Sequence, residues 1–255
     1  MGGTVVSATH LITWRIIMNL LDALRKHDFY SGKTKKTTDL FSVSEIAGGD
    51  ILQLALRRLH DIPIEEKVTQ ATLGSIFDAG LRKIIDDLNE KLNTHFYSGY
   101  RMEKQLPNGI TISGETDILD SENKWIYDAK LSKIFAMQMC EKEKEHQYKL
   151  QLNLYRWLLG DNYRMFLLWG LKDQSDANPK HPNEAMMLKE VEHIADDRLI
   201  SIAVEKSNKV ISIVNGNEQA PTKCKDTWRN DVRCKYYCDV CQFCPYYKEV
   251  SVNPF

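Results

Sequence analysis

No stretch of the 255-residue sequence approaches eighteen consecutive uncharged apolar residues, so no segment is expected to span a membrane. The first residues also lack a basic segment followed by an apolar core and a small-residue cleavage site, and we therefore expect no secretory signal. The myristoylation pattern is missed as well, because Val6 stands where serine or threonine is needed. These absences predict a cytoplasmic protein.

The chain has almost no net charge, since 34 lysines and arginines nearly balance 35 acidic residues. A strongly basic composition would have indicated a nucleic-acid partner, so any such affinity has to come from local patches. Hydrophobic residues at 43% and charged residues at 27% are typical of a globular protein. The length fits one large domain or one domain with appendages.

Cysteine is nearly absent before the C-terminal region. The one exception is Cys140, which lies in a charged helical segment and is expected to be a packed thiol. The other five lie within the last 32 residues: Cys224, Cys234, Cys238, Cys241 and Cys244. The last four of them form the pattern C-x₃-C-x₂-C-x₂-C. This density predicts metal ligation rather than a disulfide framework. Four thiolates suit tetrahedral zinc, whereas C-x₂-C-x₂-C also suits a 4Fe–4S cluster, and both stay open.

The rest of the sequence alternates helical and strand patterns. Apolar spacing predicts helices over residues 9–27, 44–60, 72–92, 135–159 and 192–214. Apolar and β-branched runs predict strands over residues 96–105, 110–119, 124–129, 163–171 and 185–191. Turn-forming residues at 107–109 and 120–123 separate the first three strands. The pattern predicts an α/β fold.

The second and third predicted strands carry the candidate chemistry. Side chains alternate across a strand, so Asp128 and Lys130 share one face and Ala129 points away. If the strands pair around the turn at 120–123, Asp117 lies near Asp128, and two carboxylates converge with one ammonium group. Carboxylates bind Mg²⁺ or Mn²⁺, and a metal-activated water beside an ammonium group suits phosphodiester hydrolysis. An isolated D-x-K pattern also occurs on ordinary exposed strands.

Further motifs flank this hairpin in order along the chain: Glu103, Gly114-x-x-Asp117, Asp128-x-Lys130 and Gln151-x-x-x-Tyr155. This order resembles the RecB-like branch of the PD-(D/E)xK nuclease superfamily, which includes cysteine-rich CRISPR adaptation nucleases and many phage exonucleases. The resemblance covers about residues 42–244. It implies a restriction-endonuclease-like core in the order α-β-β-β-α-β, with a mixed central sheet flanked by helices and a cysteine-rich metal-binding tail.

The resemblance also implies roles for the hairpin residues. Asp117 and Asp128 would hold Mg²⁺ or Mn²⁺ together with the carbonyl group of Ala129. Lys130 would orient or activate the attacking water and stabilise charge on the phosphate. In such relatives a cysteine-bound cluster clamps the fold with one upstream and three C-terminal cysteines. Here every candidate ligand is C-terminal, and which of the five cysteines bind stays open.

Two helical positions complete the implied site. Gln151 and Tyr155 are four residues apart and share a helix face, where they would line the site and help to hold DNA or metal-bound water. Relatives carry G-x-x-x-H where this chain has Gly74-Ser75-Ile76-Phe77-Asp78. Asp78 is expected to replace the histidine as an oxygen ligand. The alternative is a helix-surface charge, with the ligand lost.

Together the motifs predict a metal-dependent DNA nuclease. We expect an exonuclease acting on DNA ends or single strands, alongside partner proteins of recombination, repair or replication, and in the host cytoplasm if a phage encodes it. Two alternatives are a non-catalytic nucleic-acid-binding or assembly protein that keeps the fold, and a zinc-binding interaction module. The expected organisation is a helix and loop at 1–41, the nuclease core at 42–216 and the cysteine-rich tail at 217–255. The oligomeric state stays open.

Overall fold

The structure is a computed structural model that describes residues 37–60, 69–160, 162–173, 186–225, 234 and 238–247, with side chains described from residue 76 onward in the second range. The helix predicted over residues 9–27 lies outside these ranges. None of the helices within them is both long and apolar enough to cross a membrane.

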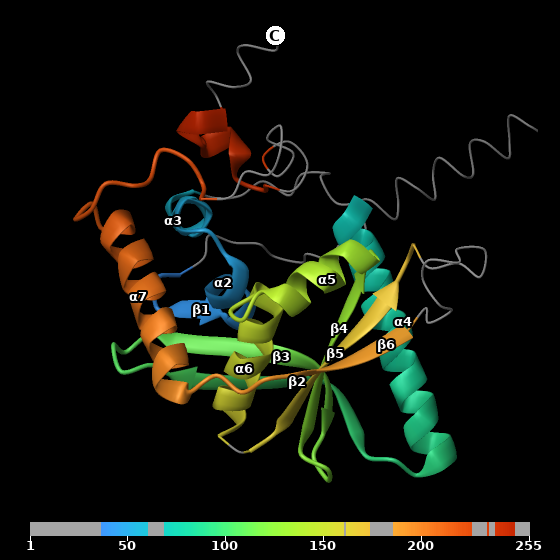
Figure 1. The fold of residues 1–255 in the computed structure, drawn as a ribbon. Helices are drawn as coiled ribbons and strands as arrows, with labels where there is room; N and C mark the ends of the chain where they lie inside the picture. The colour runs from blue at the N-terminus through green and yellow to red at the C-terminus, as the bar shows by residue number, and fades with distance from the viewer. Residues whose placement is uncertain are drawn as a thin grey trace, which may run out of the picture.

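Within the described residues, six strands form one mixed sheet at the centre of the molecule (Figure 1). The strand order is β1-β3-β4-β5-β6, and β2 pairs with β3. β1 is parallel to β3 and β4 is parallel to β5, while the other pairs are antiparallel. The strands are β1 (Leu40–Ser42), β2 (Phe96–Gln105), β3 (Thr111–Asp120), β4 (Trp125–Ser132), β5 (Arg164–Leu171) and β6 (Met186–Val191). This confirms the predicted α/β class and mixed sheet.

The helices flank the sheet on both sides. Gly114 of β3 faces α6 while the next residue, Glu115, contacts α4, and successive side chains point to opposite faces. α6 and α4 therefore cover opposite faces of β3. The helices are α2 (Val43–Gly48), α3 (Ile51–Leu59), α4 (Thr69–Leu92), α5 (Ile134–Lys142), α6 (Gln147–Leu159) and α7 (Asp196–Val214). The main core lies between the sheet and α2, α6 and α7, with Trp169 and Leu152 fully buried in it.

The single helix predicted over residues 44–60 is wrong, because the chain forms α2 and α3 with a break between them. The N-cap of α2 is Ser42, whose hydroxyl accepts the N–H of Glu45 in a capping box. Asp50 then caps α3 by accepting the N–H of Leu52. The ammonium group of Lys206 donates to the Ile46 and Gly49 carbonyls at the end of α2, so a distant residue stabilises the break.

The single helix predicted over residues 135–159 is also wrong, and α5 and α6 take its place. His146 is the N-cap of α6, since its Nδ1 accepts the N–H of Tyr148. Lys149 donates to the carbonyls of Glu141 and Glu143 in the connection. Neither proline nor glycine marks this break, which side-chain contacts stabilise instead.

The last predicted helix begins four residues later than expected, at Asp196 rather than at residue 192. The side chain of Asn153 explains the delay. It donates to the Glu192 carbonyl and accepts the N–H of Ile194, which holds residues 192–195 in an extended connection. The predicted end at Asn215 and Gly216 is confirmed, with Gly216 in the left-handed region at φ 75°.

Candidate functional site

The sheet divides at β3. On one side β3 pairs with β2 over residues 111–120, with Asp117 as the one position left out of the register. On its other side it pairs with β1 at residues 111–113 and with β4 at residues 118–120, so residues 114–117 have no described strand partner there. Beyond the Ile118–Tyr127 pair, β4 continues only along β5. Asp117 and Asp128 are therefore the first residues past the point where β3 and β4 diverge, which we call the fork.

The turn between β3 and β4 fixes this register. The carboxylate of Asp120 accepts the N–H groups of Glu122 and Asn123 and the side-chain amide of Asn123. Lys124 follows in the left-handed region at φ 58°. A shift of one residue would turn every side chain to the opposite face. The turn thus places Asp117 opposite Asp128, as the sequence predicts.

Asp128 lies at the centre of the contacts in the fork. Its side chain is 1% exposed, and the Lys130 Nζ lies 2.6 Å from its Oδ2. Gln151 of α6 donates from Nε2 to Asp128 Oδ1 at 3.2 Å and to the Tyr155 hydroxyl at 2.9 Å. Four of the predicted site residues are thus joined in one contact chain.

Asp117 and Asp78 lie around this centre. Asp117 Oδ2 accepts the N–H of Ala129 at 2.6 Å. Asp78, on α4, is exposed, and its carboxylate lies close enough to that of Asp117 for the two negative charges to repel one another. Glu103 does not join them, because it is exposed on β2 opposite Ser113, about 13 Å along the strand from Asp117.

Burial and mutual repulsion shape the charges in the fork. Burial raises the pKa of Asp128 to about 6, with a smaller contribution from Asp117. Burial also raises the pKa of Asp117, and partial desolvation together with the charge of Asp117 raises the pKa of Asp78. For Lys130, burial lowers the pKa, but Asp128 and Asp117 together outweigh it and the net pKa is raised. Lys130 is therefore an ammonium ion at neutral pH.

The donor chemistry of the fork fits a hard divalent cation. Asp117 supplies a half-buried carboxylate and Asp128 a buried one, and their charges repel one another. Such carboxylates favour Mg²⁺ or Mn²⁺. No set of three or more His, Cys, Asp or Glu side chains in the described part of the chain has the spacing of a metal site. The fit therefore rests on the Asp117–Asp128 pair, with Asp78 near it.

Gly114 has a specific packing role beside the fork. A Cβ at this position would lie 2.7 Å from Tyr155 Cε1 and 2.8 Å from Val43 Cγ2. The ring of Tyr155 thus packs against the bare backbone of β3, where it is 5% exposed. This contact positions the hydroxyl that accepts from Gln151.

Sequence reasoning missed three residues near the fork. Arg82 of α4 donates from Nη2 to Glu115 Oε1 at 2.6 Å, and the Tyr148 ring lies 5.0 Å from Lys130 Nζ. The spacing of residues along the chain could have indicated two of them. Arg82 lies one helical turn after Asp78, and Glu115 shares a strand face with Asp117.

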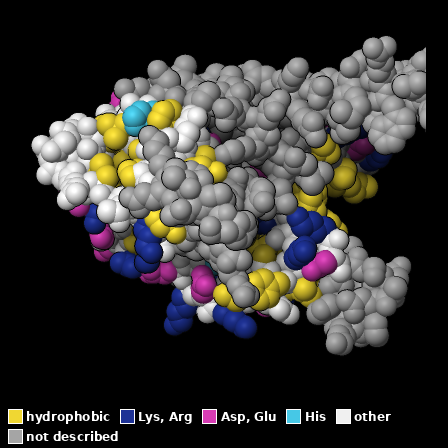
Figure 2. All heavy atoms as spheres, turned by 90° about the horizontal axis from the view of Figure 1, so that it is seen from above, with side chains coloured by type: hydrophobic (Ala, Val, Ile, Leu, Met, Phe, Trp, Pro, Cys, Tyr) yellow, Lys and Arg dark blue, Asp and Glu magenta, His cyan; other side chains and the backbone are white. Residues whose placement is uncertain are grey.

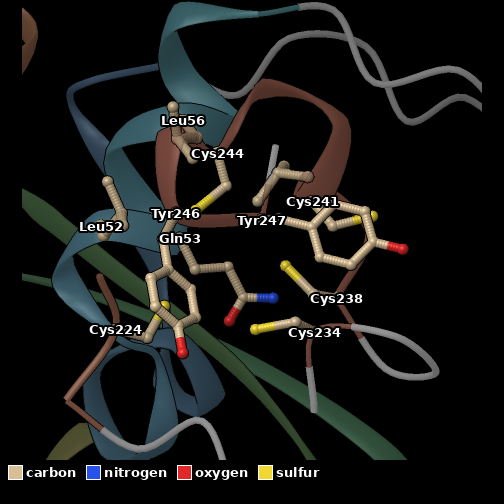
Figure 3. Close-up of a pocket in the computed structure, with 11 residues that line it drawn as sticks. Leu52, Gln53, Leu56, Cys224, Cys234, Cys238, Cys241, Cys244, Tyr246 and Tyr247 are labelled. Carbon is tan, nitrogen blue, oxygen red and sulfur yellow. The ribbon is translucent and has the colours of Figure 1, made fainter. Parts of the chain in front are cut away.

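The five C-terminal cysteines form a second site. Figure 3 shows them around one pocket beside α3, which we call the cysteine pocket. No disulfide joins any of the described cysteines. Burial raises the pKa of Cys238 to about 11, and the neighbouring Cys241 and Cys234 contribute to the shift. The thiols converge as the sequence predicts, but no three of them have metal-ligand spacing in the described chain, so the bound metal stays a prediction.

Helix α3 anchors the cysteine pocket. Arg57 donates to both carboxylate oxygens of Asp239, and Gln53 donates to the same carboxylate. The His60 ring stacks on Phe243 at 4.2 Å between centroids. Leu52 and other apolar residues of α3 pack against the tail. Cys140 lies elsewhere, 1% exposed in the main core, which confirms the predicted packed thiol.

Comparisons with known proteins bear on this geometry. The family model of the PD-(D/E)XK nuclease superfamily matches residues 50–247. No curated protein matches the chain at a significant level. The crystal structure of SSO0001 is similar, with 17% identity, 90% of this chain and 96% of that chain covered, and a TM-score of 0.57. At this level of sequence identity, the similarity between the two structures shows a shared fold and no more.

Two exonuclease structures are more distant. A phage related exonuclease from Haemophilus somnus 129PT has 18% identity, a TM-score of 0.44, and coverage of 66% of this chain and 80% of its own. An alkaline exonuclease from Laribacter hongkongensis has 11% identity, a TM-score of 0.45, and coverage of 70% and 89%. Their TM-scores are too low to bear on function.

Proposed function

The chain belongs to the PD-(D/E)XK nuclease superfamily, and from this premise we propose that it is a metal-dependent deoxyribonuclease that acts as an exonuclease on DNA ends or single strands. The fork is the observation that carries the proposal. It joins Asp117, Asp128 and Lys130 at the point where two strands diverge. A role in recombination, repair or replication is part of the same proposal.

Asp117 and Asp128 would hold Mg²⁺ or Mn²⁺, with the Ala129 carbonyl and Asp78 as further oxygen ligands. When bound, such an ion polarises the phosphate and lowers the pKa of a water molecule. Gln151 holds the Asp128 carboxylate in position through its hydrogen bond to Oδ1, and Tyr155 in turn fixes Gln151.

Lys130 has a different part in the proposed reaction. Its raised pKa keeps the proton on Nζ, so the side chain is suited to donating hydrogen bonds rather than accepting a proton. It would orient a water molecule and stabilise negative charge that develops on the phosphate. Its position against Asp128 and the Tyr148 ring restrains it for this purpose.

Any affinity for DNA has to be local. On the face drawn in Figure 2, basic and acidic side chains of the described residues are interspersed rather than gathered by sign. This agrees with the near-zero net charge of the chain. In this proposal the substrate is attracted by groups at the fork itself, including the metal ion.

The proposal extends to the cysteine pocket. Its thiols, drawn from Cys224, Cys234, Cys238, Cys241 and Cys244, would bind a 4Fe–4S cluster or zinc. Their chemistry fits either group, and their shared pocket supports the assignment. The metal would be structural, because the thiols lie in a small apolar cluster that packs the tail against α3.

A cleavage assay tests the proposed activity. Purified protein is incubated with end-labelled linear single-stranded and double-stranded DNA, and with closed circular DNA, in Mg²⁺, Mn²⁺ or EDTA. Linear DNA should be degraded only with metal, and circular DNA should survive. Asp128→Asn should lower the rate about 10³-fold, since a metal ligand contributes several kcal/mol to the transition state. The exposed Glu103→Gln serves as the matched control and should cleave normally.

The outcomes separate the proposed nuclease from its rival. If the wild-type protein binds DNA but does not cleave it with any divalent ion, it is a non-catalytic binding protein that keeps the fold. The spacing of the described carboxylates is the observation that favours this second candidate. If Asp128→Asn cleaves as fast as the wild type, the assignment of the fork is wrong.

A further inference from the structure

The pairing of β2 with β3 skips one position, directly opposite Asp117. Its register pairs Ser98 with Ile118 and Tyr100 with Thr116, which leaves Gly99 across from Asp117. Gly99 lies in the left-handed region at φ 69°, a conformation that side chains with a Cβ rarely adopt. A glycine inside a strand commonly marks a place where another group approaches the backbone closely.

The approaching group is the side chain of Arg82. A Cβ built on Gly99 would overlap Nη1 of Arg82 and lie 2.8 Å from Oε1 of Glu115. The guanidinium group of Arg82 therefore crosses β2 through the space that any other residue at position 99 would fill. It reaches Glu115 of β3, to which Nη2 donates at 2.6 Å.

This arrangement places a restrained cation beside the fork. Glu115 shares a strand face with Asp117, two residues away, and Arg82 lies close enough to interact with the charges of Asp117 and Asp78. Its side chain is 45% exposed, whereas that of Lys130 is 18% exposed. The bond to Glu115 occupies one of five guanidinium N–H donors, and nearly half of the side chain is exposed.

The charge balance makes such a cation useful. Four carboxylates, those of Asp78, Glu115, Asp117 and Asp128, gather around two cationic side chains. A DNA phosphate that approaches this cluster is repelled unless cations offset the carboxylates. A bound divalent ion would offset part of the negative charge. An arginine adds a planar guanidinium group whose paired N–H donors match two phosphate oxygens.

We propose that Arg82 is a phosphate-binding residue that holds non-bridging oxygens of a DNA phosphate beside the Asp117–Asp128 pair, and that Glu115 and Gly99 position it. This assignment rests on the proposed function, since it requires DNA at the fork. Glu115 orients the guanidinium group in the free protein, and the exposed donors bind the phosphate. Because the contact is to the backbone, it adds affinity without sequence preference.

Salt dependence of DNA binding tests the proposal. Binding of a fluorescently labelled single-stranded oligonucleotide is followed by anisotropy in Mg²⁺ at several salt concentrations, in an Asp128→Asn background to prevent cleavage. Adding Arg82→Gln should lower the slope of log Kd against log salt by about 0.7, the value for one phosphate contact on a single strand. Lys91→Gln is the matched control, because Lys91 lies on the same helix, is 71% exposed and has only a 3.9 Å ion pair. It should leave the slope unchanged.

Glu115→Gln distinguishes phosphate binding from a purely structural ion pair. If Arg82 contacts DNA, Glu115→Gln should keep the slope, because the arginine charge remains, and should weaken binding less than Arg82→Gln does. If the pair only supports the fold, Glu115→Gln and Arg82→Gln should weaken binding alike, and that result would overturn the proposal. An unchanged slope in Arg82→Gln would overturn it as well, while leaving the proposed nuclease intact. Absence of any DNA binding or cleavage by the wild-type protein in Mg²⁺ would overturn both.

Discussion

The fork and the cysteine pocket are two gatherings of potential metal ligands, and they are built in different ways. The fork takes its side chains from β3, β4, α4 and α6, and strand register and helix packing hold each one. The cysteine pocket takes its thiols from positions 224–244 and rests them against one helix, α3. The fork therefore keeps its geometry without an ion, whereas the described part of the tail rests on a small apolar cluster and polar contacts with α3. A metal at the fork would serve chemistry, and one in the pocket would serve the fold.

The two sites also differ in charge when no metal is bound. Above pH 6 the buried Asp128 is ionised close to Asp117, so the empty fork destabilises the folded state. In the cysteine pocket the pKa of Cys238 is about 11, so at neutral pH this thiol is protonated and packs beside apolar residues such as Leu56 and Val240. Metal binding there requires loss of protons, whereas metal binding at the fork relieves repulsion that already exists.

The largest expected contrast comes from mutating one candidate ligand in each of the two sites and comparing the effects. Cys241→Ser should remove the metal of the tail and lower the free energy of unfolding by about 4 kcal/mol or more, since structural metals contribute many kcal/mol. The melting temperature should then fall by roughly 10 °C. Asp128→Asn should keep the metal content of the tail and should not lower the melting temperature, while losing cleavage. Elemental analysis for iron and zinc, sulfide assay and calorimetry measure these effects.

Cys140→Ala is the control for Cys241→Ser, because it removes a thiol from the main core rather than from the tail. It should leave the metal content unchanged. Wild-type protein that contains neither iron nor zinc would contradict the role assigned to the cysteine pocket, and equal metal content in Cys241→Ser would exclude that residue as a ligand.

The pH dependence of unfolding sharpens the contrast in charge. Since the pKa of Asp128 rises from 3.8 to about 6 on folding, the folded state binds its proton more tightly, and stability falls as pH rises through this window. Below pH 4 the wild type and Asp128→Asn should be alike. Above pH 6 the variant should be more stable, by at most about 3 kcal/mol. Denaturant unfolding in EDTA between pH 4 and pH 8 measures the difference.

Mg²⁺ provides the control for this titration. Saturating Mg²⁺ should stabilise the wild type above pH 6 and leave Asp128→Asn nearly unaffected, because the ion binds the carboxylates only in the wild type. Parallel curves for the two proteins across the whole pH range would contradict the raised pKa of Asp128.

A smaller effect is expected where α6 meets the fork. Gly114→Ala places a methyl group 2.7 Å from Tyr155 Cε1, which should displace the ring and loosen Gln151 from Asp128. We expect a loss of about 2 kcal/mol of stability from overpacking and slower cleavage. Gly80→Ala is the matched control, since nothing lies within 4 Å of its Cβ and alanine favours a helix. Equal behaviour of the two variants would show that Tyr155 does not position the site.

The smallest effect is expected at the link between the cysteine pocket and α3. Asp239→Asn weakens the bidentate contact with Arg57, whose side chain is 21% exposed, and should cost about 1 kcal/mol. Hydrogen exchange should rise in residues 238–247 while cleavage stays unchanged. Glu190→Gln is the control, because its bidentate pair with Arg164 lies on the exposed β6 edge and should matter less. Unchanged exchange in the tail would show that Arg57 does not anchor it.

Sequence alone determined the parts that depend on near neighbours. The strands β2, β5 and β6 were predicted to within one residue at each end, because the alternation of side chains is a property of each segment. The convergence of Asp117 and Asp128 followed from a short turn, whose Asp120 contacts residues only two and three positions away. The clustering of the cysteines likewise followed from their spacing.

Only the tertiary structure decided the features that depend on distant partners. Lys206 stabilises the break after α2 from 160 residues away from Ile46, and Asn153 holds the chain before α7 extended. Arg82 reaches Glu115 only because Gly99 of a third element leaves room. Asp239 meets Arg57 across 182 positions. Local patterns carry no signal of such contacts, because each requires two segments whose meeting is set by the packing of the whole sheet.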